Sequence, residues 1–194
     1  MKSVIESFEF LKDLPVAKWK IVKDYKDLSS YKFPCYLKAD ISGHKTEMKA
    51  VVRCNSLEDA EEKLLEMHKN SPSNKIIIQE SSEGIEMIVG LKNDAAFGKI
   101  LAVGFGGTFA EIKKDISFRA LPISESDIIQ MVKELDSFEA FKARGKKYNL
   151  TEFYTTIQKI AHLCEVKNIK EMDLNPIIIT ENETKIVDAR IETE

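Results

Sequence analysis

The stretch EMDLNPIIITENETKIVDAR, residues 171–190, decides how this chain folds. Its apolar residues alternate with polar ones or form short runs, which is typical of β-strands rather than of helices. Glu181-Asn182 interrupts this pattern with turn-forming residues, so we expect a hairpin of two strands, Glu171–Ile179 and Lys185–Ile191.

The polar residues of the first strand fall on one face. Side chains two positions apart on a strand point the same way, so Glu171, Asp173 and Asn175 share a face. Met172 and Leu174 point the opposite way, toward a core. This strand is therefore expected to bury one side and to present a row of oxygen-bearing side chains on the other.

The second strand adds another carboxylate to this row. A tight turn would place Asp188 roughly opposite Asn175, with Arg190 on the same face as Asp188. Oxygen ligands from two neighbouring strands suit Mg²⁺ when a nucleotide phosphate completes its coordination. A solvated polar face on an edge hairpin has the same pattern, and the residues alone leave both interpretations open.

Further strands are expected upstream of this hairpin. Short apolar runs follow one another at intervals typical of a meandering antiparallel sheet. They are Lys75–Gln79, Ile85–Leu91, Lys99–Phe105, Phe109–Ile112 and Ser117–Ala120.

Helices and N-terminal strands complete the predicted elements. Ser56 and Ser124 each stand three residues before an aspartate, a capping-box pattern that predicts a helix start at both places. The predicted helices are Val4–Leu11, Leu57–His68, Glu125–Leu135 and Leu150–Val166. The remaining predicted strands are Val16–Val22, Phe33–Lys38 and Met48–Cys54.

Glycine use divides the chain. Six of its eight glycines fall between Gly84 and Gly107, so that stretch requires tight turns or close backbone approach. We therefore expect an N-terminal α+β lobe over residues 1–78 and a C-terminal α+β lobe over residues 79–194. A cleft between the lobes would be the default ligand site.

Composition excludes several classes of protein. The chain has 194 residues, is 43% hydrophobic, and its 29 basic and 32 acidic residues give a net charge of −3. This balance disfavours general nucleic-acid binding, and no apolar run is long enough to span a membrane. No signal peptide is visible, and Cys35, Cys54 and Cys164 lack the spacing of a disulfide framework. We expect a cytoplasmic protein with buried free thiols and no nucleic-acid or membrane partner.

Three further features could carry chemistry. His44 lies in a polar loop between two strands, where an imidazole is accessible as a base, nucleophile or ligand, or is an ordinary surface residue. Lys38 ends a strand and could reach a phosphate oxygen, or it is simply solvated. The run GFGGT, residues 104–108, could bring backbone amides to a phosphate, but a glycine-rich hairpin turn is the simpler interpretation.

Together these segments resemble the ATP-grasp β subunit of ADP-forming acyl-CoA synthetases (acetate–CoA ligase, ADP-forming), relatives of succinyl-CoA synthetase. The likeness runs in order over nearly the whole chain. The matching segments are FPCYLK (33–38), GHKTE (43–47), GIEMIVG (84–90) with DAAFG (94–98), GFGGTFAE (104–111) with DISFR (115–119) and Pro122, and EMDLNP (171–176) with DAR (188–190). The resemblance implies an α+β fold of two lobes, with largely antiparallel sheets flanked by helices and a nucleotide cleft between them.

The resemblance also implies roles for individual residues. Lys38 would contact nucleotide, Glu86 would hold the ribose, and the backbone near Gln79 and Glu80 would meet the adenine edge. His44 would be the phosphorylated relay residue. The implied magnesium ligands are Asn175 and Asp188, with Asp173 as a further candidate, and the matched residues of less certain role are Glu111 and Arg119, the latter counted with the nucleotide-binding set.

The implied activity is phosphoryl transfer between a phosphohistidine and ADP or ATP in the presence of Mg²⁺. It couples acyl-CoA cleavage to ATP synthesis and requires a CoA-binding α subunit, expected to form a heterotetramer with this chain. Two alternatives remain: a stand-alone ATP-grasp carboxylate ligase, in which His44 has no covalent role, and a non-catalytic ATP-grasp relic. Met48-Lys49-Ala50 stands where the family has a glycine pair, and this departure is the best support for a relic.

Overall fold

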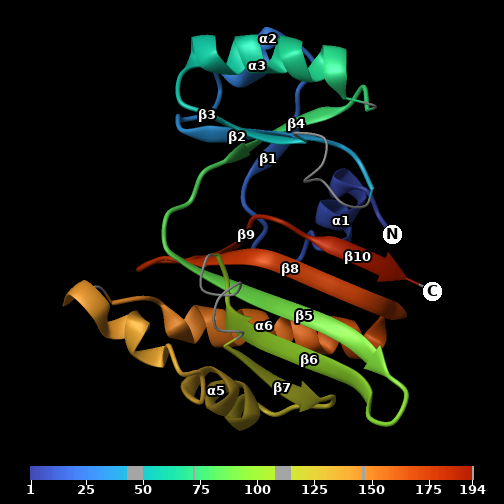
Figure 1. Cartoon of the computed structure of the whole chain (residues 1–194), viewed down its shortest axis with the longest axis vertical. Coiled ribbons are helices and arrows are strands. Elements are labelled where there is room, and N and C mark those ends of the chain that lie inside the picture. The colour runs from blue at the N-terminus through green and yellow to red at the C-terminus, as the bar shows by residue number, and fades with distance from the viewer. Residues whose placement is uncertain (43–49, 72, 108–114, 146, 194) are drawn as a thin grey trace. The chain divides into compact units, whose positions relative to one another are not determined.

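A computed structural model describes residues 1–194 except 43–49, 72, 108–114, 146 and 194 (Figure 1). The polypeptide forms two compact units. Unit 1 comprises residues 1–10 and 17–82, and unit 2 comprises residues 11–16 and 83–194. None of the described helices is both long and apolar enough to cross a membrane.

Unit 1 is built on a four-stranded antiparallel sheet with the order β1-β4-β2-β3. Helices α2 and α3 lie over one face of this sheet (Figure 1). The strands are β1 (Trp19–Ile21), β2 (Cys35–Ala39), β3 (Val51–Cys54) and β4 (Ile76–Glu80), and the helices are α1 (Val4–Phe10), α2 (Tyr25–Leu28) and α3 (Leu57–Asn70).

The core of unit 1 lies between this sheet and α3. Alternate residues of β2 and β4 are buried against α3. Ser56 begins this helix by accepting a hydrogen bond from the backbone amide of Asp59. The residues of this core include Cys35, Leu37, Cys54, Ala60, Leu64, Met67, Ile76 and Ile78. Cys35 and Cys54 are buried free thiols, and so is Cys164 in unit 2, which confirms the prediction for the cysteines.

Unit 2 contains a six-stranded antiparallel sheet, in which β8 pairs with β5, β9 and β10. The strand order is β10-β8-β5-β6-β7, and β9 also pairs with β8. The predicted meander is confirmed for β5, β6 and β7, which pair in sequence order. The strands are β5 (Ile85–Asp94), β6 (Gly98–Phe105), β7 (Ile116–Ala120), β8 (Ile169–Ile179), β9 (Thr184–Ile186) and β10 (Arg190–Thr193).

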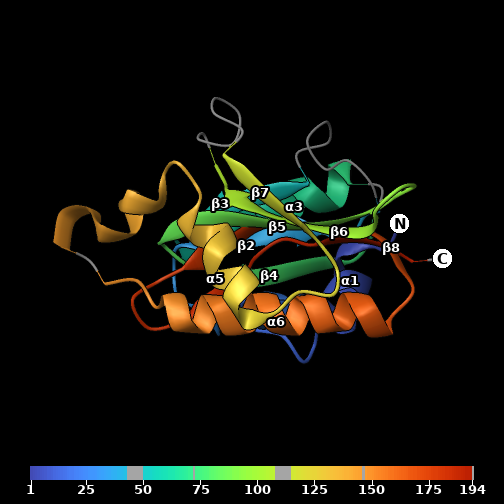
Figure 2. The same cartoon turned by 90° about the horizontal axis from the view of Figure 1, so that it is seen from below.

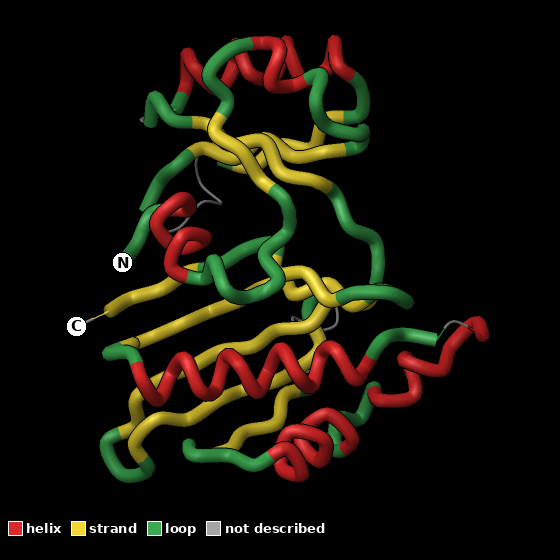
Figure 3. The backbone as a smooth tube through the Cα atoms, turned by 180° about the vertical axis from the view of Figure 1, so that it is seen from behind, coloured by secondary structure: helices red, strands yellow, loops and turns green. Residues whose placement is uncertain are grey.

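Helices α5 (Glu125–Lys133) and α6 (Leu150–Val166) cover one face of the large sheet (Figures 2 and 3). A single stripe of α6 is buried, as its 3.6-residue periodicity predicts. The buried residues of this stripe include Phe153, Ile157, Ile160, Ala161 and Cys164. On β8 the polar residues Glu171, Asp173 and Asn175 alternate with buried ones and so belong to the opposite face of the sheet.

The structure corrects the predicted elements at several places. The predicted strand 185–191 is two short strands, because residues 187–189 leave the ladder. The short helix α2 was not predicted, although Asp24 and Asp27 form a capping box at its start. The 3₁₀ segment η2 (Phe138–Gly145) was not predicted either. The predicted strand 109–112 lies outside the described residues.

The glycine-rich stretch is explained by close packing within unit 2. A Cβ on Gly84 would lie 2.1 Å from the carbonyl oxygen of Ile179, and one on Gly104 would lie 2.6 Å from that of Asp115. Neither position can accept a side chain without moving backbone. The expectation of close backbone approach in this part of the chain is confirmed.

Candidate functional site

The C-terminal hairpin places Asn175 opposite Asp188. On one side of this pair Ile177 is the partner of Ile186, and on the other side Asp173 is the partner of Arg190. Both ladders have the same register, so the pairing continues across the gap between β9 and β10. A 3.2 Å hydrogen bond from the Val187 amide to the Pro176 carbonyl joins the two segments of the hairpin beside the gap.

A second irregularity occurs at the same point of β8. The register between β5 and β8 shifts between Met87 and Val89, so the segment at Asn175-Pro176 holds one residue more than β5 does. Bulges of this kind bend a strand and redirect its side chains, and they are common beside active sites. The interruption of the ladder therefore coincides with the residues expected to hold a metal.

The two faces of β8 separate as predicted. Met172 and Leu174 are buried, whereas Glu171 and Asn175 are exposed and Asp173 is half-buried. The alternation confirms that an acidic and amide-bearing row occupies the face opposite α6. The side chain of Asp188 is half-buried.

The chemistry of this set fits a hard divalent cation only in part. The amide oxygen of Asn175 and the carboxylate of Asp188 are oxygen ligands of the kind Mg²⁺ prefers. Within the described residues, no three or more His, Cys, Asp or Glu side chains gather as a complete metal site. Two protein ligands leave most of the coordination sphere to water and to phosphate oxygens, which is the usual arrangement for Mg²⁺ in nucleotide sites.

Glu86 lies directly against the glycine pair that follows β6. The Gly106 amide donates a 2.7 Å hydrogen bond to the Glu86 carbonyl. Gly107 has a φ of +63°, and a Cβ there would lie 2.5 Å from Oε2 of Glu86. The two glycines thus allow the exposed carboxylate of Glu86 to sit close to the turn.

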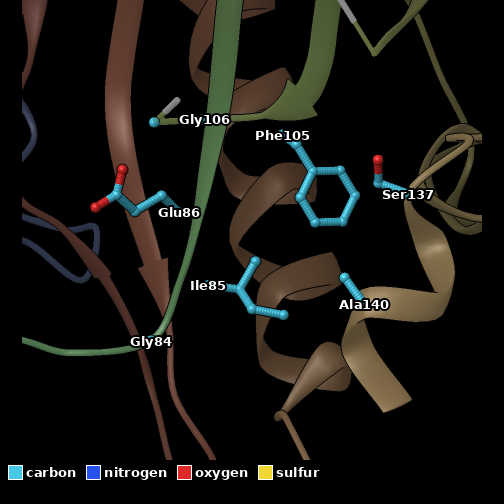
Figure 4. Close-up of a pocket in the computed structure, with 8 residues that line it drawn as sticks. Gly84, Ile85, Glu86, Phe105, Gly106, Ser137 and Ala140 are labelled. Atoms are coloured by element: carbon cyan, nitrogen blue, oxygen red, sulfur yellow. The ribbon is translucent and has the colours of Figure 1, made fainter. Parts of the chain in front are cut away.

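A cavity of about 330 Å³ opens beside this turn in unit 2. Figure 4 shows Ile85, Phe105 and Ala140 around it, with Ser137 at its edge and the Glu86 carboxylate directed away from these apolar side chains. The apolar lining could accept a flat or aliphatic group. The cavity offers few hydrogen-bonding groups, so its lining indicates the chemistry of a ligand less clearly than the hairpin residues do.

Unit 1 contributes a buried lysine on β2. Lys38 is only 5% exposed, and its Nζ lies 5.8 Å from the centre of the Phe8 ring. A buried ammonium is stable only with favourable partners, and an aromatic face is one of them.

Gln79 shares a face of the small sheet with Lys38. Its partner on β2 is Tyr36, two residues from Lys38, and its partner on β1 is Trp19. The Gln79 side chain is 1% exposed, and its Nε2 finds no hydrogen-bond acceptor among the described residues. Leaving a buried amide donor without a hydrogen-bond partner costs about 1–3 kcal/mol. A ligand that accepts a hydrogen bond from Nε2 of Gln79 would remove this cost.

The sequence interpretation assigned only backbone contacts here and missed the side chain of Gln79. The available signal was the amide residue Gln79 directly after the apolar run Ile76–Ile78. Glu80, which follows, uses its carboxylate differently: Oε1 accepts a 2.9 Å hydrogen bond from the Lys18 amide.

Arg119 lies on the helix-covered face of the large sheet, because its partner Leu101 is fully buried there. Its guanidinium donates two 2.8 Å hydrogen bonds to the carboxylate of Glu134, which directly follows α5. Ser117 donates to the same carboxylate. These donors, Arg119 first, lower the pKa of Glu134 from 4.5 to about 2.

The predicted site residues therefore fall into separate groups. Asp173, Asn175 and Asp188 occupy one region of the hairpin, and Arg119 lies on the opposite face of that sheet. Lys38, Gln79 and Glu80 belong to unit 1. His44 and Glu111 lie outside the described residues.

Comparison with known proteins identifies the family of this chain. A sequence model of the ATP-grasp domain family matches residues 6–193. The β subunit of ADP-forming acetate–CoA ligase I from Pyrococcus furiosus is 31% identical over 96% of this chain and 89% of its own length. An ADP-forming acetate–CoA ligase from Methanocaldococcus jannaschii is 34% identical over 76% of this chain, which spans only 23% of that longer protein.

A solved structure has the same fold over the whole chain. It is the dinucleotide-forming acetyl-coenzyme A synthetase 1 of Candidatus Korarchaeum cryptofilum, in complex with coenzyme A and Mg-AMPPCP, with a phosphohistidine segment pointing towards the nucleotide-binding site. The TM-score is 0.85 at 29% identity, covering 100% of this chain and 93% of that one. The chain belongs to the ATP-grasp family and, within it, to the β subunits of ADP-forming acetate–CoA ligases.

Proposed function

We propose that this chain is the nucleotide-binding subunit of an ADP-forming acyl-CoA synthetase. The net reaction would be acyl-CoA, ADP and phosphate giving the free acid, CoA and ATP, and its reverse. The observation that carries the proposal is the pair Asn175 and Asp188, held opposite each other where the β8 ladder is interrupted. The related synthetase that binds Mg-AMPPCP supports it.

In this proposal Asn175 and Asp188 hold Mg²⁺ through their side-chain oxygens, with Asp173 as a neighbouring carboxylate. When bound, the ion neutralises charge on the nucleotide phosphates during transfer. The residues themselves orient the phosphates, and the exposed position of Asn175 leaves its amide accessible to them.

The nucleotide itself would be held by Lys38, Glu86 and the segment Gln79-Glu80. Lys38 supplies a positive charge to a phosphate oxygen, and the Glu86 carboxylate accepts hydrogen bonds from ribose hydroxyls. Adenine ring nitrogens are acceptors, and the unsatisfied Nε2 of Gln79 is a donor for such a group. Arg119, with its two bonds to Glu134, would contribute indirectly by fixing the edge strand β7.

His44 would carry the phosphoryl group between two reactions. In the ATP-forming direction the P–N bond to the imidazole breaks as a P–O bond forms to the terminal oxygen of ADP, which leaves the imidazole free. In reverse, an unprotonated ring nitrogen attacks the γ-phosphorus of ATP and ADP leaves. Splitting a long transfer into two short ones is the benefit of a covalent intermediate.

A partner subunit would supply CoA binding and the acyl-phosphate chemistry. The Pyrococcus relatives are named as β subunits, and the longer relatives exceed this chain several-fold in length. A heterotetramer in the cytoplasm is the arrangement we propose for the assembled enzyme. The acyl group would be selected by the partner.

Intact-mass analysis after incubation with Mg-ATP tests the relay. The wild-type chain should gain one acid-labile phosphoryl group, and His44→Ala should gain none. His162→Ala is the matched control, because His162 is exposed on α6, and it should be phosphorylated normally. Absence of phosphate from the wild type, even with the partner subunit, acetyl-CoA and phosphate added, would contradict the relay.

A further inference from the structure

Helix α1 is docked on the face of the unit 1 sheet that carries Lys38. Leu37 belongs to the core under α3, so Lys38, the next residue of β2, points to the opposite face. Phe8 of α1 is 1% exposed, and the centre of its ring lies 5.8 Å from the Lys38 ammonium. The start of the same helix is fixed by Asp40, whose Oδ1 accepts a 2.9 Å hydrogen bond from the Ile5 amide. Two contacts therefore join α1 to the end of β2.

The Phe8 ring also contacts the strand next to Gln79. Its centre lies 5.8 Å from that of the Trp19 ring, and the two rings are tilted by 44°. Trp19 on β1 is the direct partner of Gln79 on β4. Phe8 thus lies against Lys38 and against the neighbour of Gln79, two residues that the proposed function assigns to the nucleotide. All of these contacts are made within unit 1.

An aromatic contact suits a lysine that has to bind an anion. A lysine side chain populates many rotamers, and fixing it in one of them costs free energy when the ammonium binds a phosphate. The face of a benzene ring attracts a cation but has no net charge, so this contact holds the Lys38 ammonium without neutralising it. A carboxylate in the place of the ring would compete with the phosphate for the ammonium.

Packing alone would also account for a buried residue at this position. Phe8 is one of the buried residues of α1, together with Val4 and Ile5, and its burial by itself indicates only a contact with the sheet. The two roles differ in a property that can be measured. Packing depends on the size and shape of the side chain, whereas attraction for Lys38 depends on the negative charge of the ring face.

We propose that Phe8 is a positioning residue of the nucleotide site, which holds the Lys38 ammonium in place for a phosphate oxygen of ADP or ATP. The proposal rests on the proposed function, because it requires Lys38 to contact the nucleotide. Phe8 acts through Lys38 and not on the reacting atoms, and its contact with Trp19 is a second restraint on the ring.

Stepwise fluorination of the Phe8 ring tests the proposal. Mono-, di- and trifluorophenylalanine at position 8 nearly preserve the shape of the ring but progressively remove negative charge from its face. In calorimetric titrations of the full chain, the affinity for Mg-ADP should fall with each added fluorine, by about two- to tenfold in total. Lys38→Met should itself weaken binding, and in that background the fluorinated residues should cause no further loss.

Two controls separate positioning from packing. Trp19 is the single tryptophan of the chain, so unchanged tryptophan emission shows that α1 keeps its contact with the sheet. The matched control carries the same fluorinated residues at Phe10 of the same helix, whose ring centre lies 5.3 Å from the Lys2 ammonium. Fluorination there should leave the affinity for Mg-ADP unchanged.

The possible outcomes distinguish this proposal from the proposed function. Equal affinity in all the Phe8 ring variants, together with weaker binding by Lys38→Met, would overturn the role of Phe8 alone. Wild-type affinity in Lys38→Met would overturn the role of Lys38 and the proposal with it. A loss of affinity that comes with a shift in Trp19 emission, or that persists in the Lys38→Met background, would assign the effect to packing and also overturn the proposal.

Discussion

Arg119 and Glu134 form a two-bonded ion pair in unit 2. Two hydrogen bonds join the guanidinium to the carboxylate, and Ser117 donates to the same group. Arg119 was predicted as a nucleotide-binding residue because DISFR, residues 115–119, matches the family pattern. An arginine on a strand carries no local signal of the face to which it points. The contact of Arg119 with the residue after α5 depends on tertiary packing and could not be read from local pattern.

The Glu134 carboxylate should make stability depend on pH. Its pKa is lowered from 4.5 to about 2 in the folded protein, first by Arg119 and then by Ser117. A lowered pKa contributes stability fully above the unfolded value, and this contribution is lost as the pH falls from about 4.5 toward 2. The pair is about a third exposed, so its contribution should be about 1 kcal/mol or less.

Urea unfolding of wild type and Glu134→Gln at several values between pH 7 and pH 3 measures this effect. The wild type should be more stable at pH 7, and the difference should shrink below the ordinary carboxyl pKa. Glu139→Gln is the control for removal of a surface carboxylate, because Glu139 is exposed and pairs with Lys142. A difference that stays constant down to pH 3 would contradict this assignment.

At the scale of elements, the C-terminal hairpin was largely predictable. The alternation of buried and exposed residues on β8 follows from the sequence pattern. So does the register of the pairs that flank Asn175 and Asp188, which brings these two residues across from each other. The gap at residues 187–189 did not, because the apolar alternation continues through it. The bulge against β5 is set by a strand some ninety residues earlier, and no local pattern specifies that register.

Gly84 and Gly90 open and continue the same strand, and they should respond differently to alanine. Gly84→Ala places a methyl 2.1 Å from the Ile179 carbonyl oxygen and should destabilise by about 1–3 kcal/mol or more. Gly90→Ala meets only ordinary contacts and should be neutral or stabilising by up to about 1 kcal/mol. Free energies of unfolding in urea would decide, and equal losses in both variants would refute the packing argument.

For the whole molecule, the ordered set of motifs carried more information than any single one. The fold class and the family followed from that order, and both are confirmed by the antiparallel sheets and by the match over residues 6–193. The synthetase subunit is supported over a stand-alone ligase or a relic by the β-subunit relatives. The division at residues 78 and 79 and the roles of individual site residues remain predictions, because they depend on bound ligands and on the packing of distant segments.

The central claim is that Asn175 and Asp188 create a Mg-nucleotide site, and calorimetric titration with Mg-ADP tests it most directly. The wild type should bind, and Asn175→Ala and Asp188→Ala should each weaken binding at least about tenfold, as should removal of Mg²⁺ by EDTA. Asn93→Ala, at an exposed asparagine on β5, is the control and should bind like the wild type. Wild-type affinity for Mg-ADP in both hairpin variants would contradict the account.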